Sequence, residues 1–158
     1  MDARTVDFAV AAFREEGRWT VSVLPARVAT SCASFLAALR QLPGEGGVFG
    51  FVGVEDDFFL AVREAAGRTR GFISDAMAID DWSLAGELAE VLDLDIEDDE
   101  LDEYLAIGDL SIFADFGLAA SEVELVCEDT ELYPDEQVRS IAKRLGFEAE
   151  LASALRGR

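Results

Sequence analysis

The sequence of 158 residues contains no histidine, a single lysine, two cysteines and three prolines. Without histidine, the chain lacks the base of Ser-His and Cys-His catalysis and the commonest protein ligand of metal ions. Its two cysteines, Cys32 and Cys127, are too few for a disulfide scaffold or a zinc site. No apolar run approaches the roughly 20 residues of a membrane span, and the first residues lack signal-peptide features. We therefore expect a cytoplasmic protein.

Acidic residues are what the sequence has in excess. It contains 33 Asp and Glu against 13 Lys and Arg, which gives a net charge of −20, yet 51% of its residues are hydrophobic. That apolar fraction is enough for a folded core and excludes a wholly disordered chain. A polyanion repels phosphate backbones, so we expect no direct binding of nucleic acid.

The negative charge is concentrated in the middle of the chain. Residues 76–136 contain 21 acidic residues and no basic one, whereas residues 1–75 and 137–158 have net charges of −2 and +3. The densest part is residues 93–103, DLDIEDDELDE, in which eight of eleven side chains are acidic. Carboxylates at this density repel one another, which favours a solvated linker.

Short apolar or alternating runs predict five strands, and helical periodicity predicts the helices. Residues 7–14 are apolar in both alternating sets, which predicts a strand buried on both faces. Strands are expected at residues 7–14, 18–24, 48–54, 58–63 and 69–74. Helices are expected from Thr30 or Ser31 to Leu42, from Asp80 or Asp81 to Leu92, from Ser121 with Glu124 in a capping box, and from Pro134 until Gly146. Short turns between consecutive strands imply an antiparallel sheet.

The fold class is therefore α+β, with an antiparallel sheet of about five strands in the order β-β-α-β-β-β-α. Longin and profilin-like domains have this order, a likeness of topology that implies no activity. We divide the chain into a sheet domain at residues 1–92, an acidic linker at residues 93–104 and a C-terminal helical segment at residues 105–158. We expect the last segment to pack on or beside the sheet domain.

Two motifs that would indicate a bound ligand are incomplete. The glycine-rich segment PGEGGVFGFVG follows a helix, whereas a phosphate-binding loop precedes one, and no GK[ST] follows. Gly47, Gly50 and Gly53 are instead expected to permit tight turns or a close approach within the sheet. An EF-hand loop counted from the start of the acidic run would need Gly and Glu where Asp98 and Tyr104 stand.

Paired acids occur twice, at Asp56-Asp57 and at Asp80-Asp81. Two carboxylates could serve as general acid and base or hold Mg²⁺. Both pairs, however, lie where turns and helix caps favour aspartate, so we interpret them as structural. A ligand role would require the four side chains to share one pocket.

The cysteines and tryptophans have structural interpretations as well. Cys32 and Cys127 lie on the apolar faces of expected helices, and we interpret them as buried, unreactive thiols. Trp19 alternates with the valines of an expected core strand. Trp82 follows two acids at a helix start and is our candidate interface anchor.

The acidic run permits three interpretations. It is a solubilising segment, a docking surface for a basic partner that long-range attraction steers to it, or a mimic of nucleic acid in which carboxylates take the place of phosphates. The candidate docking residues are Asp93, Asp95, Glu97, Asp98, Asp99, Glu100, Asp102 and Glu103.

Five stretches together resemble one known family. They are EGRWTVSVLP, LRQLPGEGGVFGFVGVEDDFFLAVR, the SDA…DDW segment before the acidic run, GDLSIFADFGL and LYPDEQVRSIAKRLGF. These resemble the actinobacterial tRNA adenosine deaminase-associated proteins over nearly the whole chain. That family is named for genes that neighbour the gene of the tRNA-specific adenosine deaminase, and it implies no catalytic residues. The chain is not the deaminase itself, because zinc deaminases need H-x-E and P-C-x-x-C.

We expect a non-catalytic cytoplasmic accessory protein that binds a protein partner and uses no cofactor and no metal. The resemblance implies that the partner is the tRNA adenosine deaminase, whose basic tRNA-binding surface would attract the acidic segment. One alternative is a small ligand- or Mg²⁺-binding domain that uses its carboxylates. Another is a homodimer whose sheet edges or helices pair. We expect no association with a membrane.

Overall fold

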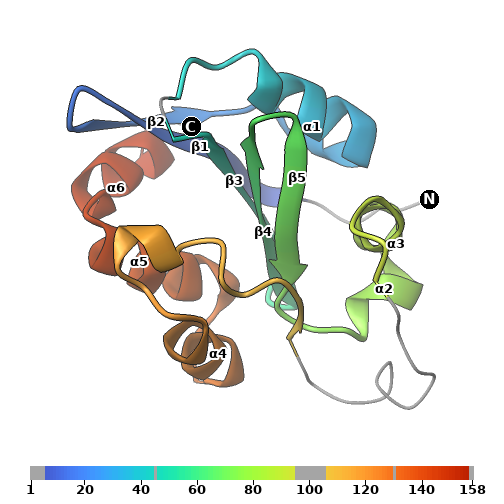
Figure 1. The fold of residues 1–158 in the computed structure, drawn as a ribbon. Coiled ribbons are helices and arrows are strands. Elements are labelled where there is room, and N and C mark those ends of the chain that lie inside the picture. The colour runs from blue at the N-terminus through green and yellow to red at the C-terminus, as the bar shows by residue number, and fades with distance from the viewer. Residues whose placement is uncertain (1–5, 45, 95–105, 130, 157–158) are drawn as a thin grey trace.

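The structure of the protein, a computed structural model, describes residues 6–44, 46–94, 106–129 and 131–156. In this part of the chain an antiparallel sheet lies between two layers of helices (Figure 1). Its strands are β1 (Val6–Glu15), β2 (Arg18–Val23), β3 (Val48–Val54), β4 (Phe58–Ala65), β5 (Arg68–Ile73) and β6 (Ile107–Gly108). The α+β fold and the five expected strands are confirmed, and the two-residue strand β6 is an addition.

The strands lie in the order β2-β1-β3-β4-β5-β6, and all neighbours are antiparallel. The chain therefore crosses from the β2 edge to the far side of β1 before it enters β3. Glu16-Gly17 joins β1 to β2, and Ala66-Gly67 joins β4 to β5, with positive φ at all four residues. Such two-residue turns match the twist of the strands and fix the register of each hairpin.

The central strands are buried on both faces, as the apolar character of β1 predicts. Alternate residues belong to two separate cores because successive side chains of a strand point to opposite faces. From β1 and β3, one core receives Ala9, Ala11, Phe13, Val48, Val52 and Val54. The other receives Phe8, Val10, Ala12, Phe49 and Phe51.

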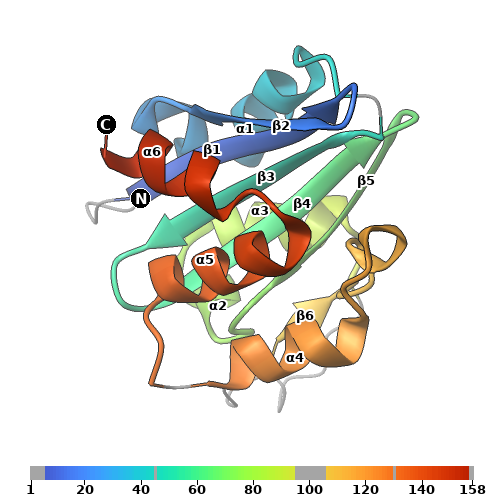
Figure 2. The same cartoon turned by 90° about the vertical axis from the view of Figure 1, so that its left-hand side faces the viewer.

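Helices of the N-terminal part cover the first core, and helices of the C-terminal part cover the second. The first layer contains η1 (Ala26–Thr30), α1 (Cys32–Arg40), α2 (Ala78–Asp81) and α3 (Ser83–Val91). The second contains η3 (Ala114–Phe116), α4 (Ala120–Glu128), α5 (Pro134–Leu145) and α6 (Glu148–Arg156). Figure 2 shows α5 and α6 in front of the strands and α1 and α3 behind them.

Three of the expected helix boundaries are confirmed. Ser31 is the N-cap of α1, and its hydroxyl accepts a hydrogen bond from the amide of Ser34 at 3.1 Å. Pro134 occupies the first turn of α5, where its missing N–H costs nothing, and Gly146 ends the helix with a φ of +105°.

Two other boundaries were wrong. Asp80 and Asp81 do not cap a long helix, because they form the end of the short helix α2 and Trp82 is the N-cap of α3. The capping contact of α4 comes from Glu122 and not from Glu124, since Glu122 accepts the amide of Ala119 at 3.3 Å. The N-cap of this helix is Ala119, two residues earlier than the Ser-x-x-Glu spacing predicts.

The glycines of β3 permit the close approach that we expected. A Cβ added at Gly50 would lie 2.7 Å from the side chains of Phe35 and Leu39 of α1. A Cβ at Gly53 would lie 2.1 Å from the ring of Phe8 on the neighbouring strand. Helix α1 and β1 can therefore approach β3 only because these positions lack side chains.

The C-terminal helices pack directly on the sheet. Val138 and Ile141 of α5 are fully buried and belong to the same core as Phe49 and Phe51 of β3. Residues 95–105 lie outside the described part, so the division of the chain at an acidic linker of residues 93–104 remains a prediction.

Candidate functional site: an acidic groove on α2 and α3

An open groove of about 860 Å³ runs along the outer side of α2 and α3. We call it the α3 groove. It is lined by Ile79, Asp80, Asp81, Trp82, Ser83, Gly86, Glu87, Ala89, Glu90, Asp93 and Leu94. Five of these residues are acidic and none of them is basic, so every formal charge in the described lining is negative.

The groove follows from a break in the helical segment at Trp82. Its backbone is extended, with φ −128° and ψ 125°, so α2 ends and α3 starts in a new direction. Trp82 is only 4% exposed, and its ring packs edge-on against Phe58, with ring centroids 5.8 Å apart. The structure thus places Trp82 in the core. Trp82 is also one of the lining residues of the α3 groove, and its role as an interface anchor remains a prediction.

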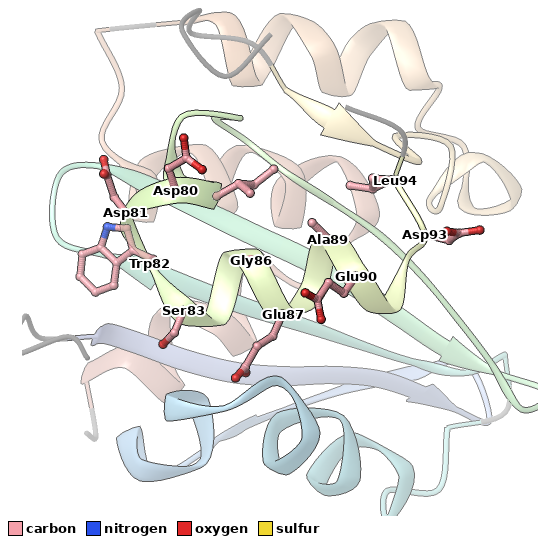
Figure 3. A pocket seen from close by; sticks show the side chains of 11 residues that line it. Asp80, Asp81, Trp82, Ser83, Gly86, Glu87, Ala89, Glu90, Asp93 and Leu94 are labelled. Carbon is pink, nitrogen blue, oxygen red and sulfur yellow. The ribbon is translucent and has the colours of Figure 1, made fainter. Parts of the chain in front are cut away.

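Helix α3 turns its polar side to the groove because its apolar side faces the sheet. Leu84, Ala85 and Leu88 are buried against the core, whereas Glu87 and Glu90 remain exposed. Figure 3 shows Asp80 and Asp81 at one end of the groove, the two glutamates along α3 and Asp93 at the other end. The five carboxylates thus follow the whole length of the groove.

Glu87 has a structural contact in addition to its place in the groove. Its Oε1 accepts a hydrogen bond from the backbone N–H of Cys32 at 2.8 Å. Cys32 is the first residue of α1, where a carboxylate is favoured by the unsatisfied amides of the helix start. Glu87 therefore joins α3 to α1 and is less suitable than its neighbours for substitution.

The acids around α2 are close enough to influence one another. Asp75 is 8% exposed, and its carboxyl accepts a hydrogen bond from the amide of Met77 at 3.0 Å. Burial raises the pKa of Asp75, and the nearby carboxylates of Asp57 and Asp81 raise this pKa further. Asp75 thus has carboxylates of both α2 and the turn between β3 and β4 as neighbours.

Of the eight docking residues that the sequence suggests, Asp93 lies in the groove and has a positive φ of 55°. The others, Asp95, Glu97, Asp98, Asp99, Glu100, Asp102 and Glu103, lie outside the described residues. Glu87 and Glu90 were missed, although their position opposite the apolar stripe of α3 was a signal that could have found them.

The carboxylate pairs do not form one ligand site. Asp80 and Asp81 line the α3 groove, whereas Asp56 and Asp57 are not among its lining residues. Among the described residues, no group of three or more His, Cys, Asp or Glu side chains could hold a metal ion. The structure therefore lends no support to the alternative of a carboxylate Mg²⁺ site in the described part.

Both thiols are buried, as expected. Burial raises the pKa of Cys32 to about 11, with further contributions from the carboxylates of Glu87 and Glu64. Burial also raises the pKa of Cys127 to about 12, with Glu124 and Glu128 adding to the effect. Thiols with such pKa values are protonated at neutral pH and are poor nucleophiles.

A buried arginine that sequence reasoning missed joins three distant segments. The side chain of Arg63 on β4 is 8% exposed and donates to both carboxylate oxygens of Asp115, at 2.7 and 2.9 Å. It also donates to the carbonyls of Gly46 and Ile112, at 2.6 and 3.0 Å. A second contact to Gly46 at 3.1 Å uses the Nε–H, so each of its five N–H groups has an acceptor.

The structure thus defines an acidic α+β protein whose sheet is covered on both faces. The chain belongs to the Rv3753c-like tRNA adenosine deaminase-associated protein family, whose model matches residues 7–148. It is also 37% identical over 150 residues to Protein Rv3753c of Mycobacterium tuberculosis, and the match covers 94% of this chain and 87% of that protein.

No solved structure matches the chain, so the likeness to longin and profilin-like domains rests on the order of strands and helices alone. Within the described part of the chain, no helix has the length and apolar character that crossing a membrane requires.

Proposed function

We propose that this protein is a non-catalytic accessory protein of tRNA modification that binds a tRNA adenosine deaminase through the α3 groove. The observation that carries the proposal is the row of five carboxylates along one groove without a cation among its described lining residues. The family description supports this choice of partner, because it names these proteins as associated with that enzyme.

The chemistry of the two surfaces is complementary. An enzyme that binds tRNA must present cations to the phosphate backbone, and these cations attract carboxylates as well. The chain contributes a net charge of −20, so attraction steers the two proteins together before they touch. Cytoplasmic tRNA modification is the setting in which such an encounter takes place.

This proposal predicts a strong dependence of binding on salt. The deaminase would be titrated with the full chain at low and at high ionic strength, and the dissociation constant would be measured by calorimetry. We expect the complex to weaken as the Debye length falls to about 8 Å and below. The contrary result is no binding at low salt, or binding that salt leaves unchanged.

Two variants of equal charge test whether the α3 groove is the surface involved. The groove variant combines Asp80→Asn, Glu90→Gln and Asp93→Asn, and Asn is among the few residues that tolerate the positive φ at position 93. The matched control combines Glu124→Gln, Glu128→Gln and Glu131→Gln, which are exposed residues in and after α4 on the other side of the sheet. Each variant removes three negative charges.

We expect the groove variant to bind the deaminase roughly tenfold more weakly, because three exposed ion pairs contribute roughly 1–2 kcal/mol in total. The control variant should retain nearly the native affinity. Equal losses in both variants would mean that only the net charge matters and that the groove is not a docking site.

Addition of tRNA gives an independent test of where the protein docks on the enzyme. If the groove contacts the tRNA-binding surface, tRNA and this protein compete, and each raises the apparent dissociation constant of the other. Simultaneous binding without competition would place the contact elsewhere on the deaminase.

A further inference from the structure

Strand β2 is one edge of the sheet, at the opposite end from β6 (Figure 2). Its inner side pairs with β1, starting with Glu15 opposite Arg18 next to the turn. Beyond the last paired residue, the amide of Leu24 donates to the carbonyl of Ala9 at 2.8 Å. Since the hydrogen-bonded positions of an antiparallel ladder alternate, the even-numbered residues of β2 bond inward to β1.

The odd-numbered residues of β2 therefore direct their backbone groups outward. These residues are Trp19, Val21 and Val23, and together they present three N–H donors and three C=O acceptors. Among the described residues, no hydrogen bond reaches these six groups. Unpaired N–H and C=O groups along one side of a strand are the groups with which an added strand would form hydrogen bonds.

The edge lacks the features that usually prevent pairing between sheets. Natural edges are blocked by proline, by bulges, by inward-pointing charges or by short strands. Strand β2 has six residues, contains no proline and pairs with β1 without a register shift. Val23 near its end is 39% exposed, and Arg18 at its start is its one charged residue.

There is room beside this edge. An open groove of about 490 Å³ lies between β2 and α6. It is lined by Trp19, Thr20 and Val21 of the strand and by Ala149, Glu150, Ser153 and Ala154 of the helix. Three of the four helical residues are small, so a further strand can lie against β2 close to α6.

We infer that a second copy of this chain adds its own β2 to this edge and extends the sheet across a two-fold axis at Val21. Val21 then pairs with the partner's Val21, and Trp19 pairs with the partner's Val23. All six outward backbone groups find partners in this register. Thr20 faces the partner's Ser22, which is a favourable pair across antiparallel strands.

Self-complementarity and charge are the reasons for choosing a second copy as the occupant. The two-fold register opposes no like charges, because Arg18 faces the partner's Leu24. Two chains of net charge −20 repel one another over most of their surface, whereas β2 carries no acidic residue. The β2 edge is thus a surface at which two such polyanions can approach.

Sedimentation of the full chain over a range of concentrations tests the inference. We expect a monomer-dimer equilibrium in which salt strengthens the dimer, because ions screen the repulsion between the two chains. This dependence is the opposite of that predicted for binding to the deaminase, so the two proposals can fail separately. A monomer at every concentration and salt would overturn the inference.

Two substitutions at one position test the strand pairing. Val23→Pro removes an outward N–H and places a ring at the seam, while the ladder to β1 does not use this N–H. Val23→Thr keeps the N–H and the branched shape. We expect the proline variant to be monomeric and the threonine variant to form dimers as the native chain does. Dimers of the proline variant with native affinity would contradict edge pairing.

The register can be read from disulfide formation, because both native cysteines are buried. Thr20 and the partner's Ser22 form a non-hydrogen-bonded pair in our register, with Cα atoms about 4.5 Å apart. A mixture of Thr20→Cys and Ser22→Cys chains should therefore cross-link on oxidation, and each variant alone should not. Cross-linking of Thr20→Cys with itself would require another register and would overturn the two-fold at Val21.

Discussion

The buried guanidinium of Arg63 allows a quantitative prediction about what holds the sheet to the segment after β6. The variant Arg63→Met keeps a long apolar side chain but removes the charge and all five donors. The carbonyl of Ile112 then loses its partner in a buried position, which costs about 1–3 kcal/mol. The carbonyl of Gly46 can turn to water, because Gly46 is exposed.

Two smaller contributions are lost in the same variant. The guanidinium carbon lies 5.1 Å from the ring centroid of Phe49 and 5.2 Å from that of Phe116. Each such contact contributes roughly 0.5–1 kcal/mol. The ion pair with Asp115 adds little, about 0–1 kcal/mol, since the Asp115 side chain is 59% exposed.

The methionine recovers part of this loss through its own apolar burial. We therefore expect Arg63→Met to lower the free energy of unfolding by about 2–3 kcal/mol, or Tm by roughly 5–10 °C for a chain of this length. Urea and thermal unfolding measure both quantities. The control is Arg139→Met on the exposed side of α5, which should stay within about 0.5 kcal/mol of the native chain.

The same network predicts a dependence on pH. Hydrogen bonds from Arg63 hold the pKa of Asp115 below its ordinary value of 3.8. A lowered carboxyl pKa stabilises the fold fully above 3.8, and this stability is lost as the pH falls through the folded-state pKa. In Arg63→Met the pKa of Asp115 is no longer lowered by Arg63. The free energy of unfolding of this variant should therefore fall less steeply with decreasing pH below 3.8 than that of the native chain. If Arg63→Met proved as stable as the Arg139→Met control, the structural role of Arg63 would be refuted.

Three further predictions follow from buried positions. Gly50→Ala should destabilise the fold by about 1–3 kcal/mol in urea unfolding, because its Cβ would lie 2.7 Å from the Phe35 ring; an unchanged midpoint would contradict this packing. Asp75→Asn should raise Tm at neutral pH. Burial raises the pKa of Asp75, so the native carboxyl stabilises the fold only while protonated, and the gain should vanish below 3.8. Cys32 and Cys127 should react with a thiol reagent only after unfolding, because burial raises their pKa values to about 11 and 12; rapid labelling of the native chain would count against their burial.

Local patterns were sufficient to predict five of the six strands that the structure describes. The two apolar sets of β1 predicted a strand that is buried on both faces, and the structure places Ala9 and Val10 in opposite cores. The Ser31 cap, the proline at residue 134 and Gly146 likewise marked helix ends through contacts within a few residues. Such signals can be read from one sequence because their physics is local.

Features that depend on distant contacts could not be predicted. The break at Trp82 arises because its ring is buried against Phe58, a residue of another element, and no local signal interrupts the helical pattern there. Arg63 finds its acceptors at Gly46, Ile112 and Asp115, up to 52 positions away. The position of β1 beside β3 is equally a property of the assembled sheet.

The candidate site was predictable in its charge but not in its shape. The sequence indicated an acidic region, and our predicted docking residues included Asp93. It did not show that Asp80, Glu90 and Asp93 line one groove, because this depends on how α2 and α3 are set against each other. The α3 groove is therefore a result of the fold.

Hydrogen exchange in the complex with the deaminase tests the central claim most directly. Amides of α3 (Ser83–Val91) should exchange more slowly when the enzyme is bound, whereas amides of α4 (Ala120–Glu128), on the other side of the sheet, should be unaffected. High salt should abolish the protection of α3. Protection of α4 without protection of α3 would contradict the assignment of the α3 groove as the docking surface.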